Sequence, residues 1–235
     1  MPRIFLFCLI LLLAAVTGNV QFVLAQAMQG DTGKLFLRHV PSGLIDFLDG
    51  NINIGSEYRF NDTWSATLDA GGIFYSQYFE KNKRATGFLL RPGVRVYPGK
   101  YKNYFVDLQL HYKQVMYNIR DWIDRDVVND VATYEEYKTF RYRKRVMGVH
   151  VMGGMKKYLS RNHRLLIEAY VGLGVHFKNQ KLVDEPNGRY DAPFSLVTTD
   201  NTNNNTAGNT SNNTPRERSV VPALPGGIRL TYRLR

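Results

Sequence analysis

The chain contains almost no cysteine. Cys8 is the single cysteine among 235 residues, and it lies in an apolar segment near the start. If that segment is removed on export, the remaining chain cannot form a disulfide framework or a cysteine-based metal site. No other pattern in the sequence indicates a metal ligand set or a cofactor site, so we expect none.

Long hydrophobic runs are also scarce. The one clear run covers residues 4–16, follows Arg3 and precedes small residues at positions 23–27. A basic start, a short apolar core and small residues near a cleavage point are typical of a secretory signal peptide. We expect cleavage after Ala25 or Ala27, so that residues 1–25 are removed and residues 26–235 form one exported domain. A membrane anchor is the alternative, but its apolar core would be short for a bilayer span.

Acidic residues are fewer than basic ones. The chain has 31 Lys and Arg against 20 Asp and Glu, which gives a formal charge of +11. In a cytosolic protein this excess would suggest nucleic-acid binding. The predicted export argues against that interpretation, and we expect no nucleic-acid partner.

What the chain does contain is alternation. In residues 164–178 every odd position from 165 to 177 is apolar, whereas the even positions are mostly small, polar or charged. A repeat of two predicts a strand, since successive side chains point to opposite faces. This segment is long enough to cross a bilayer when tilted, but its backbone then needs partners on both sides.

Seven other segments supply those partners. The eight predicted strands are residues 34–40, 51–60, 64–74, 86–96, 104–116, 140–158, 164–178 and 222–234. Their connections alternate between long and short, which predicts an all-β, eight-stranded antiparallel up-and-down transmembrane barrel. Short turns would be periplasmic and long loops extracellular, among them residues 117–139 and a loop at about 179–219. Residues 201–214 of that loop are rich in Asn and Thr, a composition typical of disorder.

Aromatic residues gather near the predicted strand ends. We expect two interfacial girdles, one containing Tyr58, Phe60, Trp64, Tyr97, Tyr104, Tyr158 and Tyr232, and the other Phe74, Tyr75, Tyr117, Phe140, Tyr142 and Phe177. Such girdles flank the apolar band of outer-membrane barrels.

If the apolar rows face lipid, the opposite rows place charges inside the barrel. The predicted interior charges are Glu57, Arg59, Asp69, Arg91, Arg95, Asp107, Lys113, Glu168, Arg229 and Arg233. Eight strands leave room only for side chains, and unpaired charges there would be costly. We therefore expect acid–arginine pairs that plug the lumen, rather than an ion path. His111 and His176 should also point inward, as hydrogen-bonded side chains more than as parts of a hydrolase site, because no motif supplies a nucleophile.

Several segments carry a resemblance to a known group of proteins. They are INIGSEYRFNDTWSATLDAGG, LLRPGVRVYP, YLSRNHRLLIEAYVGLGVHF and PGGIRLTYRL. These segments are similar to small outer-membrane barrels of unknown function from Gram-negative bacteria of the Bacteroides lineage, whose architecture is OmpA/OmpX-like. The resemblance implies a barrel and a membrane, but no activity or ligand. The chain departs from many outer-membrane proteins in ending on Arg235 rather than on an aromatic residue.

Three functions fit these observations. The first is a non-enzymatic outer-membrane barrel with a structural role or with loops that bind something outside. It would contact outer-membrane lipid and lipopolysaccharide, and an unidentified extracellular or envelope protein. The second is an outer-membrane enzyme that modifies lipids. The third is a soluble periplasmic barrel that holds a small ligand, in which the apolar rows would point inward.

Overall fold

The computed structural model describes residues 34–41, 49–76, 78–79, 82–100, 102–126, 132–185, 188–190 and 217–234. The predicted signal peptide (1–25) and the Asn/Thr-rich segment (201–214) lie outside these described residues. No helix in the described ranges is long and apolar enough to cross a membrane.

The described residues form one antiparallel sheet. Its strands are β1 (Leu35–His39), β2 (Asp49–Arg59), β3 (Trp64–Ser76), β4 (Asn82–Val96), β5 (Tyr104–Arg125), β6 (Tyr134–Tyr158), β7 (Leu165–Leu182), β8 (Gly188–Arg189), β9 (Glu217–Ala223) and β10 (Gly226–Arg233). Each of β1 to β6 pairs with the strand that follows it in the chain. β8 is a short addition at the far end of β5.

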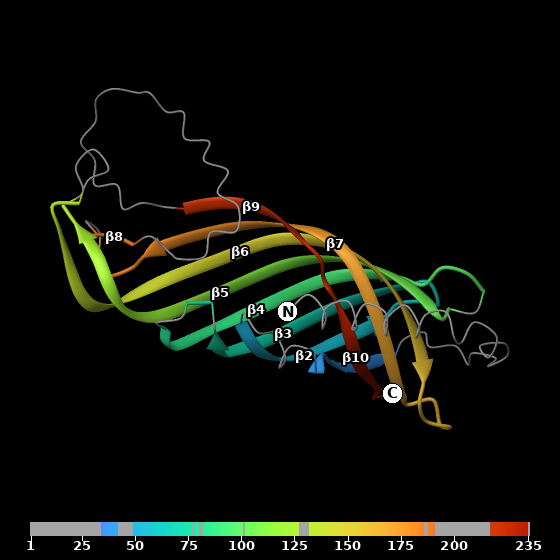
Figure 1. Cartoon of the computed structure of the whole chain (residues 1–235). Coiled ribbons are helices and arrows are strands. Elements are labelled where there is room, and N and C mark those ends of the chain that lie inside the picture. Colours follow the sequence, from blue (N-terminus) through green and yellow to red (C-terminus); the bar gives the residue numbers. More distant parts are fainter. Residues whose placement is uncertain are drawn as a thin grey trace, which may run out of the picture. The chain divides into compact units, whose positions relative to one another are not determined.

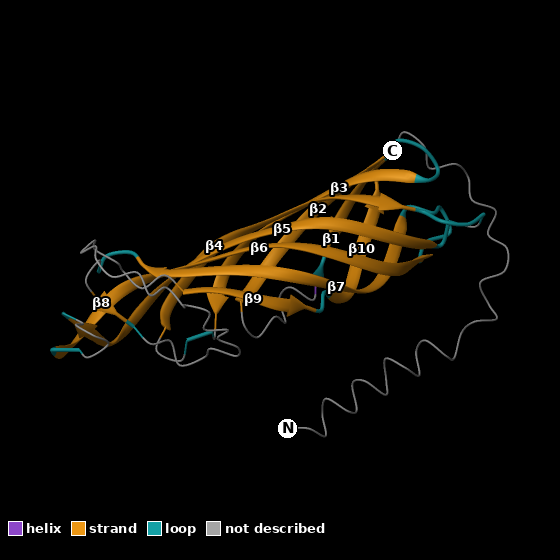
Figure 2. Cartoon of the chain, turned by 90° about the horizontal axis from the view of Figure 1, so that it is seen from above, coloured by secondary structure: helices purple, strands orange, loops and turns teal. Residues whose placement is uncertain are grey.

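The sheet closes into a ring of eight strands. β9 and β10 run one after the other along β7 and together make the eighth strand, interrupted at Leu224 and Pro225 (Figure 1). β10 also pairs with β1, which joins the last strand to the first. Figure 2 shows the strands side by side, with teal turns between them. The predicted all-β, antiparallel, up-and-down order is therefore confirmed.

The eight predicted strands correspond to the eight of the ring, but several are longer than expected, β5 and β6 most of all. β5 continues to Arg125 and β6 begins at Tyr134, so most of the predicted loop 117–139 is a paired hairpin. Its charged residues suggested a loop, yet they pair across the strands: Arg125 donates to Glu136 at 2.8 Å. That hydrogen bond lowers the pKa of the Glu136 carboxyl. The acidic side chains thus stabilise the hairpin instead of preventing it.

The predicted disordered loop at 179–219 is also too long at both ends. β7 continues to Leu182, β8 lies within the segment, and β9 begins at Glu217. An ion pair between Arg141 and Asp184 (2.6 Å) ties the end of β7 to β6, and the hydrogen bond from Arg141 lowers the pKa of Asp184. Residues 191–216 are outside the described residues.

The two faces of the sheet follow the predicted alternation. The apolar rows point outward, and Val171 (65% exposed) and Leu173 (68% exposed) are examples from β7. The charged rows point into the ring, where Arg95 and Glu168 are fully buried. This arrangement is the opposite of the one expected for a soluble barrel with an apolar interior.

The polarity of the inner face changes along the ring. On β5 the inward side chains are charged or polar from Asp107 to Lys113, and mostly apolar from Val115 to Ile123, with Asp121 as the exception. The apolar end belongs to a core of Ile73, Phe79, Ala85, Val115, Tyr117, Ile119, Ile123, Phe140, Tyr142, Leu182 and Tyr190. At this end most outward residues, such as Asn118 and Arg120, are polar, although Trp122 and Tyr137 are exposed there. The outward apolar band therefore stops before the ends of β5 and β6.

Four aromatic residues predicted for the girdles are instead buried inside the ring: Tyr97, Tyr117, Phe140 and Tyr142. The last three lie where the strands extend past the apolar band, so the inner face there is packed rather than polar. Tyr97 ends β4 on its inward side and hydrogen-bonds to charged groups. Other members of the proposed girdles point outward: Tyr58, Phe60, Trp64, Phe74, Tyr75, Tyr104, Phe177 and Tyr232.

Candidate functional site

A network of ion pairs fills the ring near the short turns, with Arg95 at its centre. The Arg95 guanidinium forms a two-pronged pair with the Asp107 carboxylate, through Nε to Oδ1 (2.5 Å) and Nη2 to Oδ2 (2.9 Å). Its Nη1 donates to Glu57 (3.0 Å) and Glu168 (2.9 Å). Arg95 therefore joins strands β2, β4, β5 and β7 across the interior. Such planar, charge-assisted contacts are the strong ones in proteins.

Three further arginines complete this network. Arg229 donates to Glu168 at 3.0 Å, and Arg38 pairs with Asp69 at 3.2 Å. Arg59 donates to Glu57 at 2.9 Å and to the hydroxyl of Tyr97 at 2.9 Å. The guanidinium of Arg59 also lies over the rings of Phe36 and Tyr97, at 4.3 and 4.4 Å from their centres.

The network is balanced in charge and dry. Four arginines face four carboxylates, so its formal charges cancel: Arg38, Arg59, Arg95 and Arg229 against Glu57, Asp69, Asp107 and Glu168. Each of these side chains is at most 2% exposed.

A polar cavity of about 490 Å³ lies between the charge network and the apolar core. Its wall includes one carboxylate, Asp49, at the start of β2. The ammonium groups of Lys113 and Lys144 lie 2.6 and 3.4 Å from Asp49. Asp49 also accepts hydrogen bonds from Ser76 (2.7 Å) and Tyr117 (2.9 Å). Asp49, the one carboxylate among the described lining residues, therefore already has four partners.

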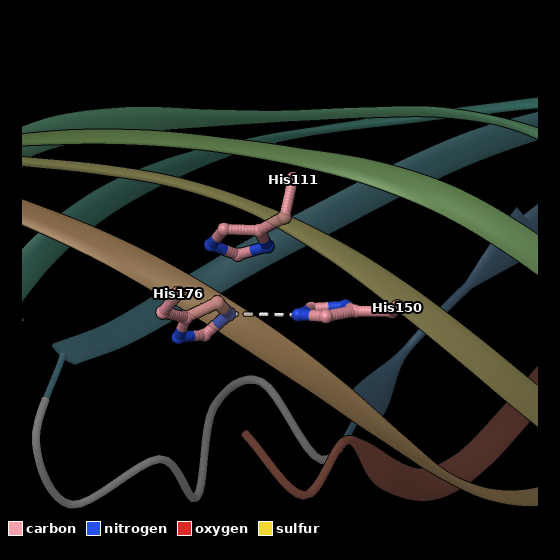
Figure 3. A group of neighbouring side chains, drawn as sticks. All are labelled: His111, His150 and His176. Carbon is pink, nitrogen blue, oxygen red and sulfur yellow. Dashed lines mark hydrogen bonds between the residues drawn. The ribbon is translucent and has the colours of Figure 1, made fainter. Parts of the chain in front are cut away.

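Three histidines from neighbouring strands meet on the cavity wall (Figure 3). His111 lies on β5, His150 on β6 and His176 on β7. The Nε2 atoms of His150 and His176 are 2.7 Å apart, so one donates to the other. The ring of His111 stacks on that of His176, with centres 4.8 Å apart and planes inclined by 26°. The prediction that His111 and His176 point inward is confirmed.

Glycines create the space for these rings. The tripeptide Gly-Val-His occurs on β6 (148–150) and again on β7 (174–176), and each glycine pairs with the other tripeptide's histidine. A Cβ added at Gly148 would lie 2.5 Å from Cδ2 of His176, and one at Gly174 would lie 2.5 Å from Cδ2 of His150. The sequence therefore encodes a reciprocal arrangement in which each imidazole covers a glycine.

We expect Gly148→Ala to destabilise the protein by about 1–3 kcal/mol, the usual cost of overpacking. The new methyl group would press on His176 and also approach the carbonyl oxygen of Val175, which cannot move freely, at 2.6 Å. Gly153→Ala on the same strand is the control, because nothing lies within 4 Å of its added Cβ. Urea unfolding in detergent measures both; equal stabilities for the two variants would contradict the proposed packing.

The structure places the ten predicted interior charges in three groups. Seven of them form the buried network: Glu57, Arg59, Asp69, Arg95, Asp107, Glu168 and Arg229. Arg91 and Lys113 are partly exposed and line the cavity instead. Arg233 is partly exposed at the short-turn end, where it donates to the carbonyl oxygen of Asn162 at 3.4 Å. The alternation correctly predicted the inward direction, but it could not distinguish residues of the buried network from residues that line the cavity.

Several interior residues were missed by the sequence analysis: Arg38, Asp49, Tyr97, Lys144, His150 and Lys156. Arg38 and Lys144 lie at the alternate positions of their strands whose side chains point inward, and this spacing could have identified them. Asp49 lies before the predicted start of its strand, so no parity could be assigned to it. His150 could have been found from the repeated Gly-Val-His tripeptide.

The chain belongs to the family described as "Protein of unknown function (DUF3575)", whose model matches residues 39–199. The match covers β2 to β8, and so includes the three histidines and most of the charge network. No curated protein and no solved structure matches the chain.

Proposed function

We propose that this member of the DUF3575 family is an integral outer-membrane β-barrel with a plugged lumen and no catalytic activity. One observation carries the proposal: a closed ring of strands has an apolar outer face and a charged, self-neutralised interior. A closed ring leaves no unpaired edge in a bilayer, where exposed backbone groups are costly. The apolar outer face then matches lipid rather than water.

Strand length and export agree with this proposal. β2 and β3 have 11 and 13 residues, close to the 9–11 that a tilted strand needs to cross a bilayer. The predicted signal peptide would carry the chain out of the cytoplasm. We accordingly place it with the small outer-membrane barrels of the Bacteroides lineage that its segments resemble, in contact with outer-membrane lipid and lipopolysaccharide.

The long hairpin of β5 and β6 indicates where a binding role would lie. Beyond the apolar band its outer face is mostly polar and its inner face is packed, so this end resembles a soluble domain. We propose that it projects outside the cell and carries the contact with an extracellular or envelope partner, whereas the charge network near the short turns serves stability.

Cysteine labelling tests the orientation, because Cys8 is the chain's single cysteine and would leave with the signal peptide. We expect Glu135→Cys, in the long hairpin, to react with a membrane-impermeant maleimide on intact cells. Arg161→Cys, in a short turn, should react only after the outer membrane is broken. Both side chains are exposed, so access alone decides the result. The reverse pattern would invert the proposed orientation, and labelling of neither in membranes would contradict insertion.

We expect the purified protein to give no steady, large-conductance openings in planar lipid bilayers. The reason is geometric: the lumen of an eight-stranded barrel is filled by side chains, and here they are locked by ion pairs. Detergent without protein is the control. Porin-like currents from the unmutated protein would contradict the plugged lumen.

A further inference from the structure

The cavity differs from the charge network in being strongly unbalanced. Arg91, Lys113, Lys144 and Lys178 line it, and Asp49 is the one carboxylate among its described lining residues. Asp49 lies within ion-pair distance of Lys113 and Lys144, whereas Lys178 has no ion pair among the described residues. Like charges held in a confined space repel one another unless an anion joins them.

Lys178 is the clearest unused donor. Within the described part of the chain its ammonium group makes no hydrogen bond and no ion pair, although it lines the cavity. It lies within electrostatic range of Lys113 and His176. An ammonium group carries three N–H donors and accepts nothing, so its natural partner is an anionic oxygen.

His111 supplies a second donor. Arg91 donates from Nε to Nδ1 of His111 at 3.2 Å. A guanidinium can only donate, so Nδ1 must be the acceptor, and the neutral imidazole then carries its proton on Nε2. That Nε2 is buried and has no hydrogen-bond partner among the described residues, while the side chain as a whole is 6% exposed. A buried N–H without an acceptor is costly, which makes the missing acceptor part of the site.

The same hydrogen bond argues against a metal ion. The three histidines offer nitrogens within 4.8 Å of one another, a spacing that a metal ion could use. A ring nitrogen that carries a proton cannot bind a metal, however, and Nε2 of His111 carries one while Arg91 occupies Nδ1. The four surrounding cations would also repel a divalent cation.

The cavity borders strand segments that, among the described residues, are paired on one side only. β1 pairs with residues 54–58 of β2, so the first residues of β2 have no described partner on that side. β9 pairs with β7 alone. Val40, Val221 and Pro225 line the cavity, which places it beside this gap in the described strands.

We propose that the cavity binds a phosphate group, held by Lys178 and the Nε2–H of His111. A phosphate presents several anionic acceptor oxygens at once, which can accept hydrogen bonds from both an ammonium group and an imidazole N–H. The volume of about 490 Å³ is within the range of ligand pockets and exceeds what a phosphate alone requires. The ligand is therefore a phosphate monoester or a phospholipid headgroup. The phospholipid alternative rests on the proposed membrane location, whereas the soluble monoester does not.

Calorimetry on the full chain in a non-ionic detergent tests the site, with inorganic phosphate and glycerol phosphate as probes. We expect saturable binding that weakens at least about tenfold in Lys178→Gln, the usual effect of losing one charged hydrogen bond. Lys181→Gln is the matched control, because it removes the same charge three residues along β7 and does not line the cavity. His111→Phe keeps a ring to stack on His176 but removes the donor, and should weaken binding as well.

The source of the phosphate is separated by vesicles that contain either phosphatidic acid or only phosphatidylcholine. The ligand is a lipid headgroup if vesicles with phosphatidic acid displace glycerol phosphate from the wild type and vesicles of phosphatidylcholine alone do not. Binding of glycerol phosphate that phosphatidic acid leaves unchanged indicates a soluble ester. Absence of saturable phosphate binding, equal loss in Lys178→Gln and Lys181→Gln, or Zn²⁺ binding in place of phosphate would overturn the proposal. None of these results depends on the conductance or labelling experiments.

Discussion

We expect Glu168→Ala to lower the free energy of unfolding by about 3–5 kcal/mol, the cost of removing one partner from a buried ion pair. Glu168 is fully buried and accepts hydrogen bonds from Arg95 (2.9 Å) and Arg229 (3.0 Å). Without it the network holds one more cation than anions. Arg95 keeps Asp107 and Glu57, but Arg229 is left with Asp107 alone, at 3.7 Å.

Urea unfolding in detergent or lipid measures this change. Glu135→Ala on β6 is the control, because Glu135 is exposed and its removal should alter stability by less than about 0.5 kcal/mol. Glu168→Gln keeps the shape and removes only the charge, so its loss of stability reports the electrostatic share. A Glu168→Ala protein as stable as the Glu135→Ala control would mean that the interior is open to water and that the lumen is not plugged.

The second large effect concerns the outer face. We expect Val171→Arg to cost about 2–4 kcal/mol, as basic residues do at the bilayer midplane of a barrel. Val171 points outward from the apolar row of β7 and is 65% exposed. In water, an exposed valine could be replaced by arginine with little effect. The expected loss therefore arises from lipid, and it should appear only where the outer face meets the membrane.

Thr139→Arg is the matched control for that position. Thr139 is exposed on β6 in the part of the hairpin beyond the apolar band, opposite Arg120. We expect folding into lipid vesicles, followed by urea titration, to show a loss at Val171 and almost none at Thr139. Equal tolerance of both substitutions would mean that the outer face does not lie in a membrane.

The sequence by itself determined the strand order and the faces. Alternation in segments such as 164–178 predicts both a strand and which side chains point inward, because the backbone pleat imposes a period of two. Short turns between neighbouring segments then fix which strands pair, and these pairs are present in the structure. The inward position of Glu168, Arg95 and Arg229 follows from parity alone.

Tertiary structure decided how the inward side chains combine. Parity places Arg91 and Arg95 on the same face, but only closure of the ring brings Arg95 against carboxylates of three other strands while Arg91 faces the cavity. The segment after Tyr117, which is rich in acidic residues, forms a paired hairpin because of tertiary contacts. Arg125 reaches Glu136 only when β5 and β6 lie side by side. Local pattern fixes direction because it acts within one strand; charge balance, burial and the cavity depend on contacts between residues far apart in the chain.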